Sequence, residues 1–227
     1  QKAAAHQLLV DMHGAYPPNG LNRTWPNYLT QEGVMGAEYN KWSRRVTATH
    51  NVSLPFTRML LGPVDYTPGG FRNATPATFQ VVGSPPQVQT TRGHALGMYV
   101  VYESPFQMVS DSPDVYVNAA GFDFVKQVPT IWDETRFVDG DIDDYVVVAR
   151  RKGADWYLGM LGNERPHAID VPLGFLGKAR FEAHLYEDGG SPTTLKETIR
   201  EVGAADTLHL SVAPSGGAAV RFRARLN

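Results

Sequence analysis

The sequence predicts an α/β region followed by an all-β region. Through about residue 125, short apolar runs are separated by long loops and helix-like segments, a pattern typical of parallel α/β units. After about Lys126, short strand-like runs alternate with turn residues, which favours an antiparallel β-sandwich. We place the boundary between residues 126 and 140 and divide the chain into 1–130 and 131–227.

The first region contains four predicted elements. Residues 8–13 are apolar without alternation, as expected of a buried parallel strand, and residues 56–61 are predicted to form a second such strand. Residues 29–42 are predicted to be helical. Residues 92–110 are predicted to form a second helix, kinked at Pro105.

The second region begins with a predicted hairpin. Its turn is the segment 152–155, which contains Gly153 between two apolar runs. Turn residues also separate the later apolar runs, so we predict strands at 145–150, 156–161, 168–171, 180–186, 207–212 and 218–224.

Composition excludes several classes of protein. The formal charge of −2 provides no basic surface for nucleic acid or an anionic membrane. No apolar run reaches the roughly 20 residues that a membrane helix needs. With no cysteine, the 227 residues form no disulfide and offer no thiol nucleophile. The chain begins at Gln1 without an initiator Met or the apolar segment of a signal peptide, so we expect it to begin inside a longer protein.

Two carboxylates, Glu32 and Glu38, are candidates for catalysis or metal binding. On a continuous helix, six residues correspond to about 600°, so the side chains would point about 120° apart. Gly33 and Gly36 between them would let a non-helical segment bring both together. Spacing alone favours the alternative, two solvated carboxylates on a helix.

Other polar residues follow the predicted strands. His13 follows the first strand and Asp65 follows the second, where parallel α/β enzymes carry catalytic groups. Arg23 and Trp25 could clamp and stack a sugar. Each also has a structural interpretation: a hydrogen-bonded histidine, an Asx turn at Asp65, or an Arg–Trp packing pair.

Several motifs, in order, resemble glycoside hydrolase family 97. They are His13-Gly14, Pro18-Asn19-Gly20, Arg23-Thr24-Trp25-Pro26-Asn27, Glu32-Gly33-Val34-Met35-Gly36-Ala37-Glu38 and Gly62-Pro63-Val64-Asp65-Tyr66-Thr67-Pro68-Gly69. The resemblance extends over the whole chain, including residues 145–153. It implies three parts in the parent enzyme: an N-terminal β-sandwich, a (β/α)8 barrel and a C-terminal β domain. Residues 1–130 would then be the later part of the barrel, and residues 131–227 the C-terminal β-sandwich.

The resemblance also implies roles for the candidate residues. Glu38 matches the general acid, Glu32 and Glu38 match ligands of Ca²⁺, and His13 matches a substrate-binding residue. Substrate binding is also expected of Arg23, Trp25 and Asp65. Hard carboxylate oxygens suit Ca²⁺.

Gly14 departs from the pattern of the inverting members, which carry a glutamate there as general base. At this position the sequence therefore resembles the retaining branch of the family, in which the nucleophile is an aspartate on an earlier strand. Retention needs two carboxyl groups about 5–5.5 Å apart. We expect that aspartate to precede Gln1, and Asp11, inside its strand, is not expected to replace it.

The prediction is therefore a retaining, calcium-dependent α-galactosidase, present here as a fragment that is inactive alone. Alternatives are an α-glucosidase of the same family and a non-catalytic carbohydrate-binding module. The expected partners are an α-galactoside or oligosaccharide substrate and the missing N-terminal part. Open strand edges also favour an oligomer. The family's usual setting implies export to a bacterial periplasm.

Overall fold

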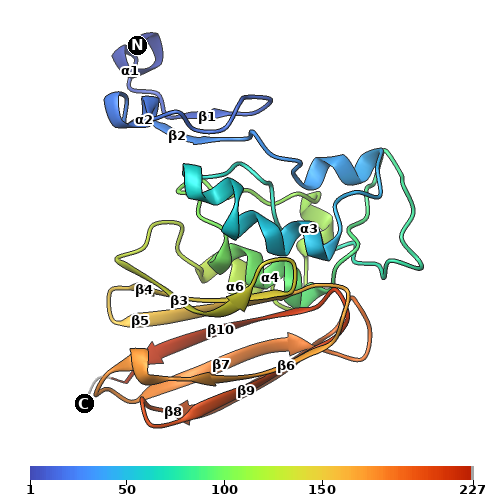
Figure 1. Cartoon of the computed structure of the whole chain (residues 1–227), viewed down its shortest axis with the longest axis vertical. Helices are drawn as coiled ribbons and strands as arrows, with labels where there is room; N and C mark the ends of the chain where they lie inside the picture. Colours follow the sequence, from blue (N-terminus) through green and yellow to red (C-terminus); the bar gives the residue numbers. More distant parts are fainter. Residues whose placement is uncertain (226–227) are drawn as a thin grey trace.

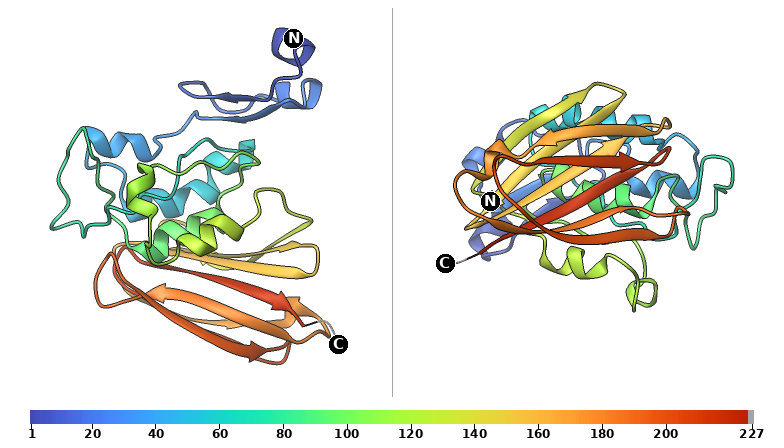
Figure 2. Two further views of the ribbon diagram at one scale, coloured as in Figure 1. Left: turned by 180° about the vertical axis from the view of Figure 1, so that it is seen from behind. Right: turned by 90° about the horizontal axis from the view of Figure 1, so that it is seen from below.

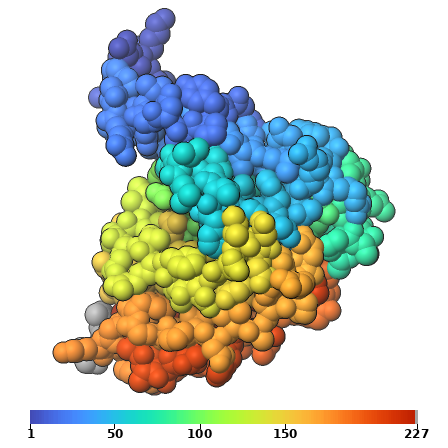
Figure 3. All heavy atoms as spheres, viewed as in Figure 1, coloured from blue at the N-terminus to red at the C-terminus, as the bar shows by residue number. Residues whose placement is uncertain are grey.

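The computed structural model describes residues 1–225. Figure 1 shows three tiers: the N-terminal segment at one end, helices and loops in the middle, and two β-sheets at the other end. In the space-filling view, the N-terminal residues protrude from the rest of the molecule (Figure 3).

The C-terminal part is built from antiparallel strands. A six-stranded sheet has the order β3-β4-β5-β10-β7-β8, and β6 pairs with β9 in a second sheet. All six strands predicted after residue 140 are confirmed. The bounds are β3 Glu134–Asp141, β4 Tyr145–Lys152, β5 Asp155–Gly162, β6 His167–Pro172, β7 Phe181–Asp188, β8 Leu195–Val202, β9 Thr207–Val212 and β10 Gly217–Ala224, with a 3₁₀ turn η4 at Gly174–Leu176.

The two sheets pack face to face around one apolar core. Leu208, Leu210 and Val212 on β9 are buried and alternate with exposed polar residues, which is the period of two expected of a strand with one buried face. They pack in the same cluster as Leu158 of β5 and Phe222 of β10. The predicted antiparallel β-sandwich is therefore confirmed.

Helix α4 (Arg92–Val101) covers the other face of the larger sheet, as both views of Figure 2 show. All ten of its residues are buried. Small residues make this close packing possible. A Cβ on Gly97 would lie 2.6 Å from the carbonyl oxygen of Met160 on β5, closer than a side chain tolerates.

Residues 1–130 contain short elements joined by long loops. β1 (Val10–Met12) and β2 (Tyr28–Gln31) are parallel neighbours, and Val64 forms an isolated parallel bridge to Gln31. A barrel is not shown by this chain. The other elements are α1 Lys2–Ala5, α2 Leu21–Thr24, η1 Ala37–Lys41, α3 Ala48–Ser53, η2 Leu54–Phe56, η3 Arg58–Leu61, α5 Pro113–Tyr116 and α6 Phe122–Gln127.

Two predicted elements of this region are wrong. Residues 56–61 were expected to form a strand, but the segment lies in the 3₁₀ turns η2 and η3. Pro55 occupies the first turn of η2, where its fixed φ suits a helix, and Leu60 is 77% exposed. Residues 29–42 form β2 and η1 instead of one helix, because Gly33 turns the chain with φ +45°.

The helix predicted at 92–110 is correct only in its first part. It ends at Val101, well before Pro105. The division at residue 130 stays a prediction, although β3 begins close to it, at Glu134. No helix in residues 1–225 combines the length and apolarity needed to cross a membrane.

Candidate active site

Three parallel chain segments end side by side and carry His13, Glu32 and Asp65. The N–H of Glu32 donates to the carbonyl oxygen of Met12 at 3.0 Å, and the N–H of Asp65 donates to that of Gln31 at 3.0 Å. The side chains that follow β1, β2 and Val64 therefore share one edge. Sequence reasoning predicted this position for His13 and Asp65, although Asp65 follows a single bridge residue instead of a full strand.

Glu38 reaches the same edge from the 3₁₀ turn η1. The N–H of Ala37 donates to the carbonyl oxygen of Tyr66 at 3.0 Å, which fixes the start of this turn. A Cβ on Gly36 would lie 3.0 Å from the same oxygen, so the close approach favours glycine there. The structure thus brings Glu32 and Glu38 together, as the glycine-interrupted spacing allowed.

His13 lies between carboxylates. Its Nδ1 is 2.8 Å from Asp65 Oδ2, and its Nε2 is 3.0 Å from Glu38 Oε1. A carboxylate oxygen can accept from a ring nitrogen that carries a proton, so both contacts are hydrogen bonds donated by His13 when its ring is protonated. The hydrogen bond to Asp65 and the nearby charge of Glu32 raise the pKa of His13 to about 9. The surrounding carboxylates thus favour the protonated form of the His13 ring.

Glu32 completes a cluster of three possible metal ligands. Its carboxylate accepts the N–H of Gly14, and its Oε1 is 3.9 Å from His13 Nε2. One donor atom from each of His13, Glu32 and Glu38 lies within 4.8 Å of the others. The side chain of Glu32 is 8% exposed, whereas that of Glu38 is 30% exposed. Glu38 is therefore the carboxylate that an incoming molecule can reach.

Arg58 holds the backbone behind this cluster, and sequence reasoning missed it. Its guanidinium donates to five carbonyl oxygens at 2.8–3.2 Å, and the side chain is almost fully buried. These oxygens belong to Gln31, Glu32, Gly33, Gly62 and Pro63. Nothing local marks Arg58, because it stands in an apolar run that resembled a strand.

Asp11 lies behind His13 on β1. Burial, with the negative charges of Asp65 and Glu32, raises the pKa of Asp11 to about 6. Its Oδ1 is buried and has no hydrogen-bond partner among the described residues. Asp11 therefore adds a fourth carboxyl group to those around His13.

Arg23 and Trp25 are not brought to this cluster. The N–H of Tyr28, at the start of β2, donates to the carbonyl oxygen of Trp25 at 2.9 Å, and that of Val10 donates to Asn27 at 2.8 Å. Trp25 thus lies at the amino ends of β1 and β2, opposite the carboxyl edge. A substrate-binding role for Arg23 and Trp25 stays a prediction.

Two family models match the chain. The model "Glycosyl-hydrolase 97 C-terminal, oligomerisation" matches residues 131–223, and "Glycoside hydrolase 97" matches residues 1–34. A retaining alpha-galactosidase of Bacteroides thetaiotaomicron is 37% identical over 98% of this chain. The chain belongs to glycoside hydrolase family 97. It corresponds to the C-terminal portion of the enzymes of that family.

Solved structures of family 97 agree with this assignment. An enzyme from Pseudoalteromonas sp. strain K8 in complex with acarbose superposes with a TM-score of 0.90 and 39% identity, covering 99% of this chain. A variant of that enzyme in complex with panose also gives a TM-score of 0.90, at 38% identity over 99% of this chain. The chain spans about a third of these family 97 proteins: 35% of the Bacteroides enzyme and 36% of each Pseudoalteromonas structure.

Proposed function

We propose that the full-length protein is a retaining, calcium-dependent α-glycoside hydrolase that acts on α-galactosides. The observation that carries this proposal is the meeting of Glu32 and Glu38 around His13, at the carboxyl edge of parallel segments. The similarity to a retaining alpha-galactosidase supports the sugar and the stereochemistry.

Glu38 is the general acid in this proposal. Its partly exposed carboxyl group can approach a glycosidic oxygen, whereas Glu32 and Asp65 are buried. Protonation of that oxygen by Glu38 would let the leaving group depart as a neutral alcohol. In the second step of a retaining mechanism, the Glu38 carboxylate would accept a proton from the attacking water. The nucleophile would come from a part of the enzyme outside these residues.

The backbone at Gly14 supports retention over inversion. Gly14 has φ +68°, a conformation that residues with a side chain rarely adopt, and its N–H donates to Glu32. A glutamate base at this position would be strained in the observed backbone. The expected product is therefore the sugar with its anomeric configuration retained.

The donor set around Glu32 and Glu38 fits Ca²⁺. Carboxylate oxygens are hard ligands that suit calcium. A calcium ion takes six to eight oxygen ligands in all, some of them from water. Glu32 and Glu38 would hold the ion together with ligands from elsewhere in the enzyme. When bound, calcium would add positive charge beside the acid. His13, beside both carboxylates, would donate a hydrogen bond to the substrate.

An α-glucosidase is the second candidate. The relatives bound to acarbose and panose favour it, because panose is built of α-linked glucose units. Their identities to this chain, 39% and 38%, are close to the 37% of the alpha-galactosidase. Galactose and glucose differ only in whether the 4-hydroxyl is axial or equatorial.

The parent protein would include the remaining barrel strands and an N-terminal domain, with residues 1–130 closing the barrel. The C-terminal sandwich would serve oligomerisation, as the description of its family model indicates. Export to a bacterial periplasm is part of the same proposal, and residues 1–227 alone would be inactive.

The deciding assay compares p-nitrophenyl α-galactoside with the α-glucoside, using full-length enzyme with and without EGTA. Galactoside cleavage that EGTA abolishes and calcium restores would support the proposal. Cleavage of the glucoside alone would favour the second candidate. Full activity in EGTA would exclude a requirement for calcium. Proton NMR of the first-formed sugar then distinguishes retention from inversion.

A further inference from the structure

A chain of buried polar side chains runs from the C-terminal sheet to the active-site edge. The hydroxyl of Tyr66 donates to Asn51 Oδ1 at 2.6 Å, and Asn51 Nδ2 lies 3.4 Å from His94 Nε2. His94 Nδ1 lies 3.0 Å from the carbonyl oxygen of Gly216, just before β10. All three side chains are at least 96% buried.

The hydrogen-bond direction in this chain is fixed. A carbonyl oxygen only accepts, so the proton of neutral His94 must be on Nδ1, facing Gly216. Burial lowers the pKa of His94 to about 4, so the ring is neutral near pH 7. Its Nε2 must then accept from Asn51 Nδ2. This turns Asn51 Oδ1 towards Tyr66, whose hydroxyl has to be the donor.

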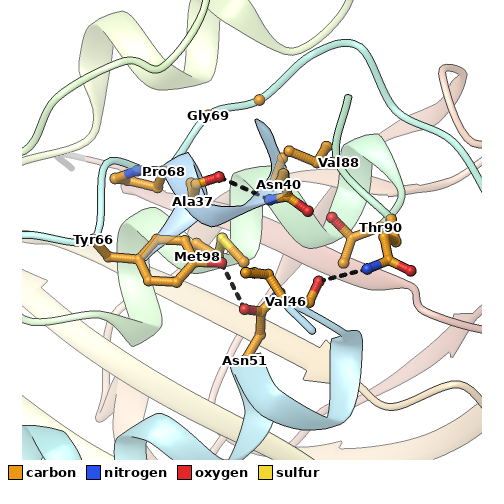
Figure 4. Close-up of a pocket in the computed structure, with 13 residues that line it drawn as sticks. Ala37, Asn40, Val46, Asn51, Tyr66, Pro68, Gly69, Val88, Thr90 and Met98 are labelled. Atoms are coloured by element: carbon orange, nitrogen blue, oxygen red, sulfur yellow. Dashed lines mark hydrogen bonds between the residues drawn. The ribbon is translucent and has the colours of Figure 1, made fainter. Parts of the chain in front are cut away.

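Tyr66 connects this chain to the carboxylates. It directly follows Asp65, and its carbonyl oxygen accepts the N–H of Ala37, which precedes Glu38. Figure 4 shows the ring of Tyr66 beside Asn51 and Ala37 at a small cavity. The cavity volume is about 10 Å³, far too small for a sugar. Tyr66 and Asn51 therefore bond to each other there and not to substrate.

We propose that Tyr66, Asn51 and His94 are positioning residues that fix Glu38 relative to Asp65, with the sandwich as their support. This proposal rests on the proposed function of Glu38. Because the two carboxylates are on separate loops, the peptide of Tyr66 is the direct backbone link between them. Its side chain is anchored by Asn51, and through His94 to the turn before β10.

The test compares Tyr66→Phe with Tyr102→Phe in the full-length enzyme. Tyr102 is a matched control: it is also fully buried, packs edge-to-face on Tyr66 at 4.9 Å, and donates to Asn51, but to its backbone oxygen. Each variant loses one buried hydroxyl. Both are assayed at a temperature where circular dichroism shows them folded.

We expect Tyr66→Phe to lower kcat by about ten- to hundred-fold, with KM within about twofold, because small misplacements of catalytic groups slow the reaction without weakening binding. Tyr102→Phe should leave both constants unchanged. Equal kcat values in the two variants would overturn the proposal and leave Tyr66 a purely structural residue.

The activity of the wild-type enzyme tests the proposed function separately from the positioning role. If that enzyme cleaves no glycoside, the two variants are compared by calorimetric titration with Ca²⁺. Displacement of Glu38 from Glu32 would weaken the binding of an ion that both carboxylates hold. Weaker binding in Tyr66→Phe than in Tyr102→Phe would support positioning. Equal affinities would overturn it.

Discussion

The two ends of this chain achieve order by different means. In the sandwich, alternating side chains on β9 and β10 fill one core, and strand pairing satisfies the backbone. Around the active-site edge, the strands are only three or four residues long, and a buried side chain, Arg58, binds the carbonyl oxygens of the loops. Reactive groups on loops thus depend on a few buried polar anchors, whereas the sandwich depends on many small apolar contacts.

The largest effect that separates the two regions is expected at Glu38. Glu38→Gln in the full-length enzyme should lower kcat/KM for an α-linked oligosaccharide by about 10²- to 10⁴-fold, the range for loss of a general acid. Measured without calcium, the thermal unfolding midpoint should change little, because Glu38 is partly exposed and lies outside the sandwich core. Unchanged kcat/KM would exclude Glu38 as the acid.

The opposite result is expected in the sandwich. Leu158 is fully buried, so Leu158→Ala should lower the free energy of unfolding by about 2–5 kcal/mol. Urea unfolding measures this, and Ile199→Ala on edge strand β8 is the control, since Ile199 is 61% exposed. The folded Leu158→Ala protein should keep its kcat. A loss of kcat in that folded protein would mean that the two regions are not separable.

A smaller, pH-dependent effect on the free energy of unfolding is expected at His94. Its pKa is about 4 when folded and about 6.5 when unfolded, so the unfolded chain binds more protons between these values. The free energy of unfolding should therefore fall as pH drops from 6.5 to 4, by about 3 kcal/mol from this residue. Urea unfolding across this range should show a weaker pH dependence in His94→Gln. An identical dependence would mean that His94 does not titrate in this way.

The smallest effect is expected at Trp25. The substrate-binding role expected of Trp25 predicts a rise in KM for galactoside and glucoside in Trp25→Ala, smaller than the effects above because Trp25 lies at the amino ends of β1 and β2, away from Glu38. Steady-state kinetics of the full-length enzyme check this. An unchanged KM would remove Trp25 from the substrate-binding residues.

The fold of the sandwich was more predictable than that of the first region, for physical reasons. Strands with a buried face alternate in polarity, so β9 and β10 could be identified. The edge strands β3 and β8 were missed, because Arg136 and Lys196 belong to runs exposed on one or both faces. Residues 56–61 form 3₁₀ turns, since apolar composition alone does not distinguish a strand from a short helix.

The candidate site was predictable where local pattern or resemblance reached it. His13 and Asp65 follow apolar segments, and the family motif marked Glu32 and Glu38. Arg58 was missed because its partners are backbone atoms of distant loops, which leave no side-chain pattern in the sequence. The same holds for Asn51 and His94, which are 43 residues apart in the chain and meet only in the folded structure.

The central claim is that Glu38 protonates the leaving group, and the dependence of rate on that group tests it most directly. For full-length wild-type and Glu38→Gln enzymes, kcat/KM is measured on an α-galactosyl oligosaccharide and on 2,4-dinitrophenyl α-galactoside, whose leaving group needs no proton. We predict a large loss on the oligosaccharide and a much smaller loss on the dinitrophenyl glycoside. Equal losses on both substrates would contradict the account and leave Glu38 as a ligand or structural residue only.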